Sequence, residues 1–293
     1  MISIILNGCR GAMGQAFARI AAMSEDVHVV AGVDIRVAAE GRAGTGTNPT
    51  ANPAANPAIS PGASSSASHG EGEAHAGGAF PEYARLADID AGIAEAAGAL
   101  VDFSNPAALD DVLEFAIEKR LPTLVATTGH TEAQKRRIAD ASLSIPVFQS
   151  ANLSVGVSLL AELARKAAAV LGGAFDVELV EKHHSRKVDA PSGTALMLAD
   201  AVNSALPDEE GLEYVYSRRE KHEKRGKREL GIHSVRGGTI VGEHVLIFAG
   251  NDEVIELRHA ASSRDIFAEG AVRAARFIAA AREPKLYGMR DLI

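Results

Sequence analysis

The sequence predicts an α/β protein built from a Rossmann-like doubly wound parallel sheet and a second α+β domain with an open mixed sheet. Two observations predict the first part. A short apolar strand runs into a glycine-rich turn and a helix, and strand-like and helix-like segments then alternate. One observation predicts the second part: after Asn152 this alternation gives way to a long helix and to strands with one polar face.

Length and composition limit the possible classes of protein. The 293 residues suit about two domains, at roughly 150 residues each. The formal net charge of -8 and the absence of tryptophan argue against a nucleic-acid partner. No apolar run is long enough to span a bilayer, and the single cysteine, Cys9, excludes an internal disulfide. We therefore expect a cytoplasmic protein with no membrane partner.

The first predicted unit is a β-α-β segment over residues 2–36. An apolar strand from Ile2 to Leu6 meets the glycine turn, and the following helix has apolar residues at helical spacing. A second apolar strand, 27–33, ends at Asp34. This order predicts two neighbouring parallel strands joined by a right-handed crossover.

Residues 37–80 interrupt the pattern. Between Gly41 and Ala79 the chain is rich in small and polar residues, and the dipeptide Asn-Pro occurs three times. Little here can be buried to offset the entropy of ordering, so we expect a mobile surface insertion. A lid over a site is the less favoured alternative, because the segment has few side chains that could anchor it.

The alternation resumes after Phe80. Asn105 is placed to cap the helix that follows the third strand, with Pro106 in its first turn. The predicted strands of this region are 99–103, 123–126 and 145–148, and a helix begins at Thr131.

The second part is predicted to begin with a helix over 154–171 that ends at Gly172. Its predicted strands are 175–182, 239–248 and 253–259, and the last helix covers 264–281. The expected division is therefore a dinucleotide-binding domain, 1–151, a substrate-binding and oligomerisation domain, 152–263, and a C-terminal segment, 264–293, that returns to the first domain. We expect the basic run from Arg218 to Arg228 to be a solvated loop, because glutamates are interleaved in it.

The glycine turn is the first predicted site. Gly8, Gly11 and Gly14 lie between a strand and a helix, where glycines let the backbone approach a pyrophosphate. Asp34 follows Gly14 by 20 residues and is placed to bind the adenosine ribose. A tight turn without a ligand is the alternative. Asp34 favours NADH, whereas Arg36 could admit NADPH, so we expect NADH or NADPH with NADH favoured.

The second predicted site is the segment from Glu181 to Ala195. It places His183, His184, Arg186 and Lys187 together in an acidic protein, and Ser192 then opens a helix predicted over 195–204. Free N–H groups at a helix start suit a carboxylate. The alternative is a charged strand end with an ordinary helix cap. A metal site is not expected, because no second cluster completes a ligand shell.

The pattern Glu-x-His-His-x-x-Lys-x-Asp-Ala-Pro-Ser-Gly-Thr-Ala at 181–195 resembles the signature of the 4-hydroxy-tetrahydrodipicolinate (dihydrodipicolinate) reductase family. The resemblance covers nearly the whole chain outside 37–80. Its other motifs are Asn7–Gly14, Val101–Ser104, Thr127–Gly129, Ser150–Val157, Arg236–His244 and Ser263–Ala268.

The resemblance implies NAD(P)H-dependent reduction of 4-hydroxy-tetrahydrodipicolinate, via dihydrodipicolinate, to tetrahydrodipicolinate in the diaminopimelate pathway of lysine biosynthesis. It implies that His183 and Lys187 exchange protons and that His184, Gly193 and Thr194 bind a substrate carboxylate. It also implies a homotetramer. The implied cofactor contacts are Gly8, Cys9, Arg10, Gly11, Ala12, Met13, Asp34, Ala126, Thr127, Thr128, Ser150, Ala151, Asn152 and Leu153.

The sequence departs from the family pattern at Ala126, where many members have glycine, and at Ile35, where many have arginine. Ile35 weakens the case for NADPH. Phe103 is expected either to border the cofactor cleft or simply to pack, and Arg236 either to support the substrate site or to lie on the surface. Two other functions stay open: reduction of another cyclic imine or keto dicarboxylate, and a non-catalytic NAD(H) sensor whose insertion recruits a partner.

Overall fold

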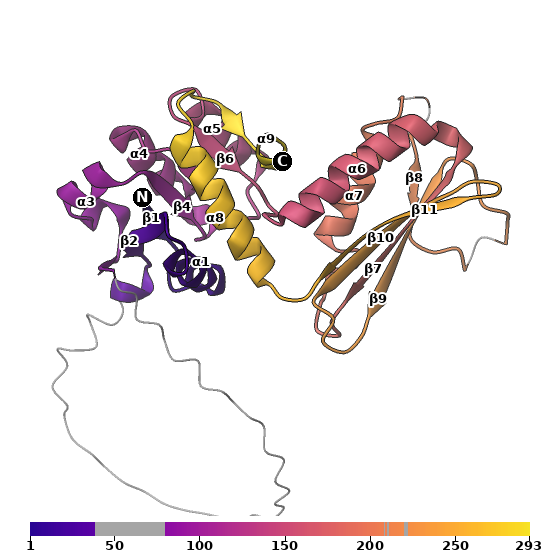
Figure 1. Cartoon of the computed structure of the whole chain (residues 1–293), viewed down its shortest axis with the longest axis horizontal. Coiled ribbons are helices and arrows are strands. Elements are labelled where there is room, and N and C mark those ends of the chain that lie inside the picture. Colours follow the sequence, from indigo (N-terminus) through magenta and orange to yellow (C-terminus); the bar gives the residue numbers. More distant parts are fainter. Residues whose placement is uncertain (39–79, 208, 210, 220–221) are drawn as a thin grey trace, which may run out of the picture.

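The computed structural model describes residues 1–38, 80–207, 209, 211–219 and 222–293 (Figure 1). The insertion predicted over 37–80 therefore lies outside the described residues, except at its two ends. The described part contains two sheets, which lie side by side along the long axis of the molecule in Figure 1.

The first sheet, sheet A, has seven parallel strands in the order β12-β6-β5-β4-β1-β2-β3. The order reverses direction between β1 and β4, as in doubly wound folds, so the predicted fold of the first part is confirmed. The strands are β1 (Ile2–Asn7), β2 (Val27–Val33), β3 (Glu82–Tyr83), β4 (Ala99–Asp102), β5 (Thr123–Val125), β6 (Val147–Gln149) and β12 (Leu286–Tyr287).

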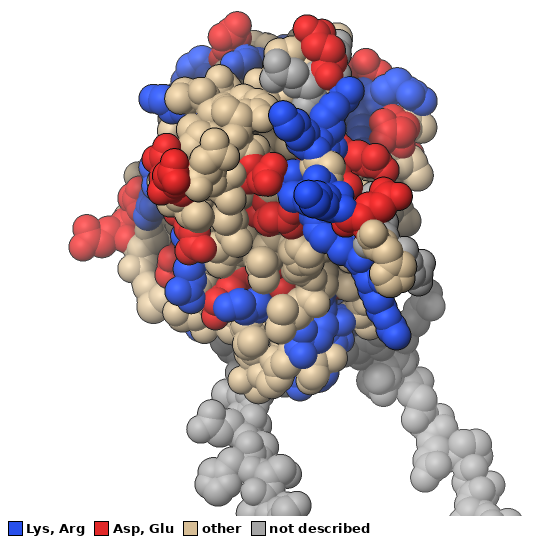
Figure 2. Space-filling view, turned by 90° about the vertical axis from the view of Figure 1, so that its right-hand side faces the viewer, with Lys and Arg blue, Asp and Glu red and all other residues tan. Residues whose placement is uncertain are grey.

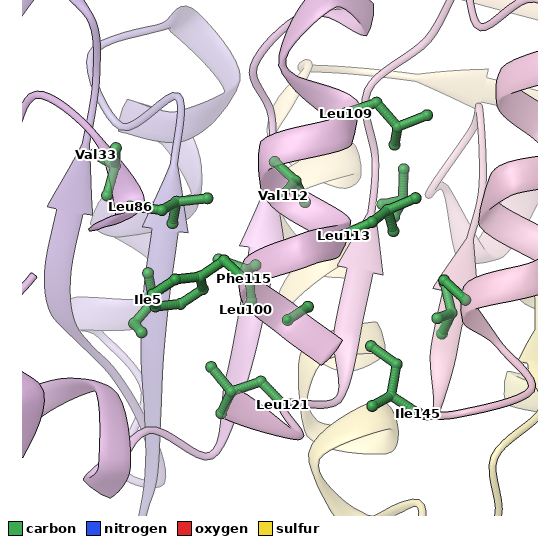
Figure 3. Close-up of a cluster of buried hydrophobic side chains, with 14 of the residues drawn as sticks. Ile5, Val33, Leu86, Leu100, Leu109, Val112, Leu113, Phe115, Leu121 and Ile145 are labelled. Carbon is green, nitrogen blue, oxygen red and sulfur yellow. The ribbon is translucent and has the colours of Figure 1, made fainter. Parts of the chain in front are cut away.

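Helices cover both faces of sheet A because successive apolar residues of each strand point to opposite sides. Ile5 and Leu100 pack under the helices of one face, as Figure 3 shows, whereas Ile4 and Val101 pack under those of the other. The first face carries α3 (Ala91–Ala96), α4 (Leu109–Lys119) and α5 (Glu132–Ala141), with the short turns η1 (Leu86–Asp88) and η2 (Pro106–Ala108). The second carries α1 (Ala12–Ala22) and α8 (Asp265–Ala280).

The second sheet, sheet B, is mixed and has the strand order β11-β10-β7-β9-β8. Its apolar face packs against α6 (Val155–Leu171) and α7 (Gly193–Asn203), so the open mixed sheet is confirmed. The strands are β7 (Asp176–His183), β8 (Glu213–Val215), β9 (Glu229–Arg236), β10 (Gly242–Ala249) and β11 (Val254–Ala261). The short turn η3 (Gly172–Ala174) joins α6 to β7, and α9 (Met289–Leu292) ends the chain.

Several predicted boundaries are wrong in detail. The strand predicted over 239–248 begins only at Gly242, because Gly238, with φ of +48°, lies in the turn that follows β9. The helix predicted over 195–204 begins two residues earlier, because the Ser192 hydroxyl accepts a hydrogen bond from Ala195 N. The predicted Asn105 cap is confirmed: its side chain accepts from Ala107 N at 2.9 Å.

The basic run is not simply a solvated loop. Arg218 forms ion pairs with Glu178 and Glu229, and Arg225 pairs with Asp176 and Glu178. These acidic residues belong to β7 and β9, so the arginines neutralise charge on the strands. Basic and acidic side chains are accordingly interspersed on the end of the molecule shown in Figure 2.

Candidate functional site

The glycine turn lies between β1 and α1, at the carboxyl edge of sheet A, and lines a cavity of about 260 Å³. Gly8 has a φ of +78°, and a Cβ there would lie 2.6 Å from the backbone carbonyl of Phe103. Only glycine can lie this close to the Phe103 backbone. Because glycine has no side chain, the backbone groups of the turn stay accessible to a ligand. Asn7, Gly11, Asp34 and Phe103 also line the cavity, so Phe103 borders the cleft.

Asp34 is buried at the end of β2 beside this cavity. Its two carboxylate oxygens accept hydrogen bonds from Nε and Nη2 of Arg36, each at 2.8 Å, and from the backbone N–H of Arg10. Burial alone would raise the pKa of Asp34, but the hydrogen bonds from Arg36 and Arg10 outweigh burial and lower it. Asp34 is therefore an anion, and a ribose bound here would share it with Arg36.

The remaining residues of the glycine turn fall into two groups. Gly11 caps α1, so Ala12 and Met13 are its first helical residues and their N–H groups suit an anion. Cys9 is buried, and burial together with the nearby Glu82 and Asp34 raises its pKa to about 12. The thiol therefore stays protonated and packs in the core.

A buried carboxylate that the sequence reasoning did not interpret holds the edge of sheet A together. Asp102, at the end of β4, accepts hydrogen bonds from Asn7 Nδ2 at 2.8 Å, from Ser104 Oγ at 2.6 Å and from Thr127 Oγ1 at 2.6 Å. Asn7 is the last residue of β1, and Ser104 and Thr127 lie just after β4 and β5. An aspartate at the end of a buried strand was the available signal, because parallel strands end at one edge of a sheet.

The other predicted cofactor segments lie at the same edge. Ala126, Thr127 and Thr128 follow β5, and the segment 150–153 follows β6. The Asn152 side chain donates a hydrogen bond to Thr194 Oγ1 at 3.0 Å, across to the start of α7. The two groups of site residues predicted from the sequence are thus joined directly.

The second group is organised around Glu181 near the end of β7. Its carboxylate is fully buried and contacts Nδ1 of His183 at 2.5 Å, and Arg236 donates one hydrogen bond to each oxygen at 2.8 Å. Burial alone would raise the pKa of Glu181, but hydrogen bonds from Arg236, Ser234 and His183 lower it to about 2. Arg236 therefore supports this site and is not a free surface residue.

His184 and Lys187 lie in the loop after β7. Burial and the neighbouring cations Arg264 and Arg186 lower the pKa of His184, whose Nδ1 is buried without a hydrogen-bond partner among the described residues. Lys187 is held 2.9 Å from the Asp189 carboxylate. Both side chains can thus bind an anionic ligand, His184 through its unpaired Nδ1 and Lys187 through its ammonium group.

The start of α7 completes this group. Gly193 and Thr194 are its first two residues, so their N–H groups have no partner within the helix. Ser192 caps the helix, and its own N–H donates to Glu181 at 3.2 Å. The helix start and His183 are therefore anchored to one carboxylate.

His244 packs edge-on against His183, with ring centroids 5.3 Å apart, and its Nε2 lies 3.1 Å from Ser192 Oγ. Burial, with the nearby His183, lowers the pKa of His244 to about 4. His244 is therefore neutral near pH 7 and acts in the site as a packing and hydrogen-bonding group.

The His244 shift predicts a pH dependence of stability. Between pH 6.5 and 4 the unfolded chain binds a proton that folded His244 does not, so the free energy of unfolding falls as the pH is lowered, by about 3 kcal/mol in total. The variant His244→Asn should lose this part of the slope in urea unfolding measured from pH 7 to pH 4. The slope from the half-buried His259, whose pKa is lowered in the same direction, should persist. An unchanged slope in His244→Asn would contradict the assignment.

Within the described ranges, we find no group of three His, Cys, Asp or Glu side chains placed to hold a metal ion. None of the helices in these ranges has the length and apolar character that a membrane crossing requires.

A doubly wound sheet with a glycine turn and a terminal acidic residue, joined to a second sheet that presents titratable side chains, defines a nicotinamide-nucleotide-dependent oxidoreductase. Comparison with known proteins narrows the class. Family models described as "Dihydrodipicolinate reductase, N-terminus" and "Dihydrodipicolinate reductase, C-terminus" match residues 2–153 and 156–293. The chain belongs to the dihydrodipicolinate reductase family.

Individual relatives agree with this assignment. A 4-hydroxy-tetrahydrodipicolinate reductase of Caldanaerobacter subterraneus subsp. tengcongensis is 41% identical over 293 residues, which cover 100% of this chain and 98% of the relative. One from Exiguobacterium sibiricum is 47% identical over 195 residues, covering 67% of this chain and 75% of the relative. The solved structure of dipicolinate-bound dihydrodipicolinate reductase from Paenisporosarcina sp. TG-14 has a TM-score of 0.73 at 23% identity, covers both chains fully, and supports the fold.

Proposed function

We propose that this chain reduces 4-hydroxy-tetrahydrodipicolinate, via its dehydration product dihydrodipicolinate, to tetrahydrodipicolinate with NADH or NADPH. The observation that carries the proposal is the group formed by His183, His184, Lys187 and the start of α7, tied by the Asn152–Thr194 hydrogen bond to the cofactor edge of sheet A. A ring with two carboxylates suits this concentration of donors.

The cofactor fits the glycine turn, because the backbone there is open where a Cβ would close it and the first N–H groups of α1 can bind an anion. The residues that would hold it are the turn from Gly8 to Met13, Asp34, the turn 126–128 and the segment 150–153. When bound, the reduced nicotinamide supplies the hydride. The protein then supplies orientation and the balancing proton.

In the proposed mechanism, the N–H groups of Gly193 and Thr194 and the unpaired nitrogen of His184 bind substrate carboxylate. Lys187 leaves Asp189 to face the ring, where its ammonium stabilises the charge that develops after hydride transfer. His183, as the imidazolium, donates the proton from Nε2 while Nδ1 stays on Glu181. One hydride and one proton would thus be added across one double bond of the ring, the hydride from the bound cofactor and the proton from His183.

We further propose that NADH is favoured and that Arg36 allows NADPH. Asp34 repels a 2′-phosphate, but Arg36 has a side chain 55% exposed and can turn from Asp34 to the phosphate. Arg36→Ala should raise the KM for NADPH by about 10-fold and leave that for NADH within about 2-fold. Arg137→Ala removes an arginine paired with Asp110 away from the cavity and is the matched control. Equal effects on both cofactors in Arg36→Ala would contradict this role.

The sequence patterns and the resemblance together motivate three broader proposals, which concern the domains, the oligomeric state and the location. Residues 1–151 form the dinucleotide-binding domain, and residues 152–263 form the substrate-binding and oligomerisation domain. The segment 264–293 returns to the first domain. The chain acts as a homotetramer in the cytoplasm.

A coupled assay tests the function. Pyruvate, aspartate semialdehyde and the synthase that condenses them generate the substrate in place, and oxidation of NADH or NADPH is followed at 340 nm. Oxidation that requires the synthase, both of its substrates and this protein supports the proposal. Cofactor binding without oxidation would favour the sensor, and oxidation only with other cyclic imines would favour a different substrate.

A further inference from the structure

We propose that Glu181 and Arg236 are positioning residues that fix the tautomer and orientation of His183. The inference rests on the proposed role of His183 in proton transfer. It concerns two residues that are paired with each other, one near the end of β7 and one at the end of the neighbouring strand β9.

The charge state of Glu181 decides the direction of its contact with His183. Glu181 is fully buried and is held as a carboxylate by two hydrogen bonds from Arg236. A carboxylate only accepts hydrogen bonds, so Nδ1 of His183, 2.5 Å away, must be the donor. The proton of a neutral His183 therefore stays on Nδ1, and Nε2 is the nitrogen that exchanges a proton with a ligand.

The surroundings of the ring agree with this orientation. A Cβ at Gly242 would lie 3.1 Å from Nε2, so the glycine of β10 leaves room beside that nitrogen. His244, also on β10, packs against the ring edge-on and limits its rotation. The Glu181–Arg236 pair thus fixes which nitrogen of His183 exchanges a proton before a substrate binds.

Arg236 connects this arrangement to the substrate loop. Besides Glu181, its Nη2 donates a hydrogen bond to the backbone carbonyl of Asp189 at 2.6 Å, and Asp189 is the ion-pair partner of Lys187. Glu181 also accepts from the Ser192 N–H at the start of α7. One ion pair, with its carboxylate buried, therefore sets the positions of His183, the Lys187 loop and the carboxylate-binding helix start relative to one another.

The test uses Glu181→Gln and Arg236→Lys in the full-length protein. Histidine ring nitrogens are labelled with ¹⁵N, and the His183 signals are assigned by their loss in His183→Asn. In the unmodified protein the neutral ring should carry its proton on Nδ1. In Glu181→Gln this preference should be lost, and kcat should fall by about 100-fold or more, as expected for a wrong tautomer, with the NADH dissociation constant unchanged.

Arg236→Lys keeps the positive charge but cannot donate to both carboxylate oxygens in the same geometry. We expect it to retain the Nδ1 proton and to lose about 10-fold in kcat, with the NADH dissociation constant again unchanged. If Glu181→Gln fails to fold, Arg236→Lys still tests the proposal. Glu243→Gln is the matched control, because Glu243 lies on β10 of the same sheet and pairs with Lys182 and Arg258. It should leave kcat and the His183 tautomer as they are.

A folded Glu181→Gln that keeps its His183 proton on Nδ1, or either variant with unchanged kcat, would overturn the inference. The nitrogen spectra need no turnover, so they separate it from the proposed function. If His183→Asn itself retained full activity, the proposed role of His183 would fail while the tautomer result still reported on Glu181.

Discussion

Replacing His183 by alanine should lower kcat by about 10³-fold while the dissociation constant for NADH is unchanged. The reason is local: His183 lies at the end of β7 in sheet B, whereas the glycine turn and Asp34 lie at the edge of sheet A. Removing the ring takes away the proposed proton donor and leaves the cofactor contacts untouched. Stopped-flow turnover and fluorescence titration with NADH measure the two quantities separately.

His233→Ala is the matched control for this experiment. His233 belongs to β9 of the same sheet, where it contacts Glu178, and it takes no part in the site described above. Its replacement should leave kcat unchanged. Full activity in His183→Ala would sink the proposed proton transfer, and a parallel loss of NADH binding would show that the substitution had disturbed both sheets.

Replacing Gly14 by alanine should weaken cofactor binding and destabilise the protein. Gly14 lies in α1, and a Cβ there would be 2.2 Å from the carbonyl oxygen of Gly8 and 2.8 Å from Cα of Cys9. Both contacts are with backbone, so the turn itself has to move. We expect at least a 10-fold rise in the NADH dissociation constant and a loss of about 3 kcal/mol in the free energy of unfolding, as for other overpacked sites.

Gly92→Ala provides the comparison, because Gly92 is also a helical glycine, in α3, but a Cβ there meets nothing within 4 Å. The change should stabilise the protein by up to about 1 kcal/mol through helix propensity and leave cofactor binding unaltered. Calorimetry and NADH titration of the two variants side by side would settle the matter. Similar behaviour of both would mean that α1 does not need the close contact with the turn.

Five of the seven strands of sheet A, namely β1, β2, β4, β5 and β6, could be predicted because each has its own local signal, whereas the two-residue strands β3 and β12 were missed. The apolar strand before Gly8 and the acidic residue after β2 are visible in the sequence within a few residues. The strands β8 and β9 were missed for the opposite reason. In β9 the buried Leu230 and Ile232 alternate with Gly231 and His233, and His233 is explained by its contact with Glu178 on the adjacent strand.

In the candidate site, too, contacts between residues that are distant in sequence could not be predicted. The residues of the 181–195 segment could be found because they are close in sequence, and Asp34 and Arg36 are only two positions apart. The pairing of Glu181 with Arg236 spans 55 positions and depends on β7 and β9 lying in register, with His183 opposite Arg236. No sequence spacing encodes that register. The resemblance to the family implied the roles of the site residues but did not show which other residues position them.

The chain passes between the two sheets twice, once after β6 and once between β11 and α8. With a single connection, one sheet and its helices could rotate about any axis relative to the other. Two connections restrict such a rigid-body movement to rotation about the line that joins them. Asn152 belongs to the first connection, so its hydrogen bond to Thr194 lies near this axis and can survive the rotation. A rigid-body closure of the cofactor edge on the His183 site would then follow one arc only and would bring the same groups to the same facing positions.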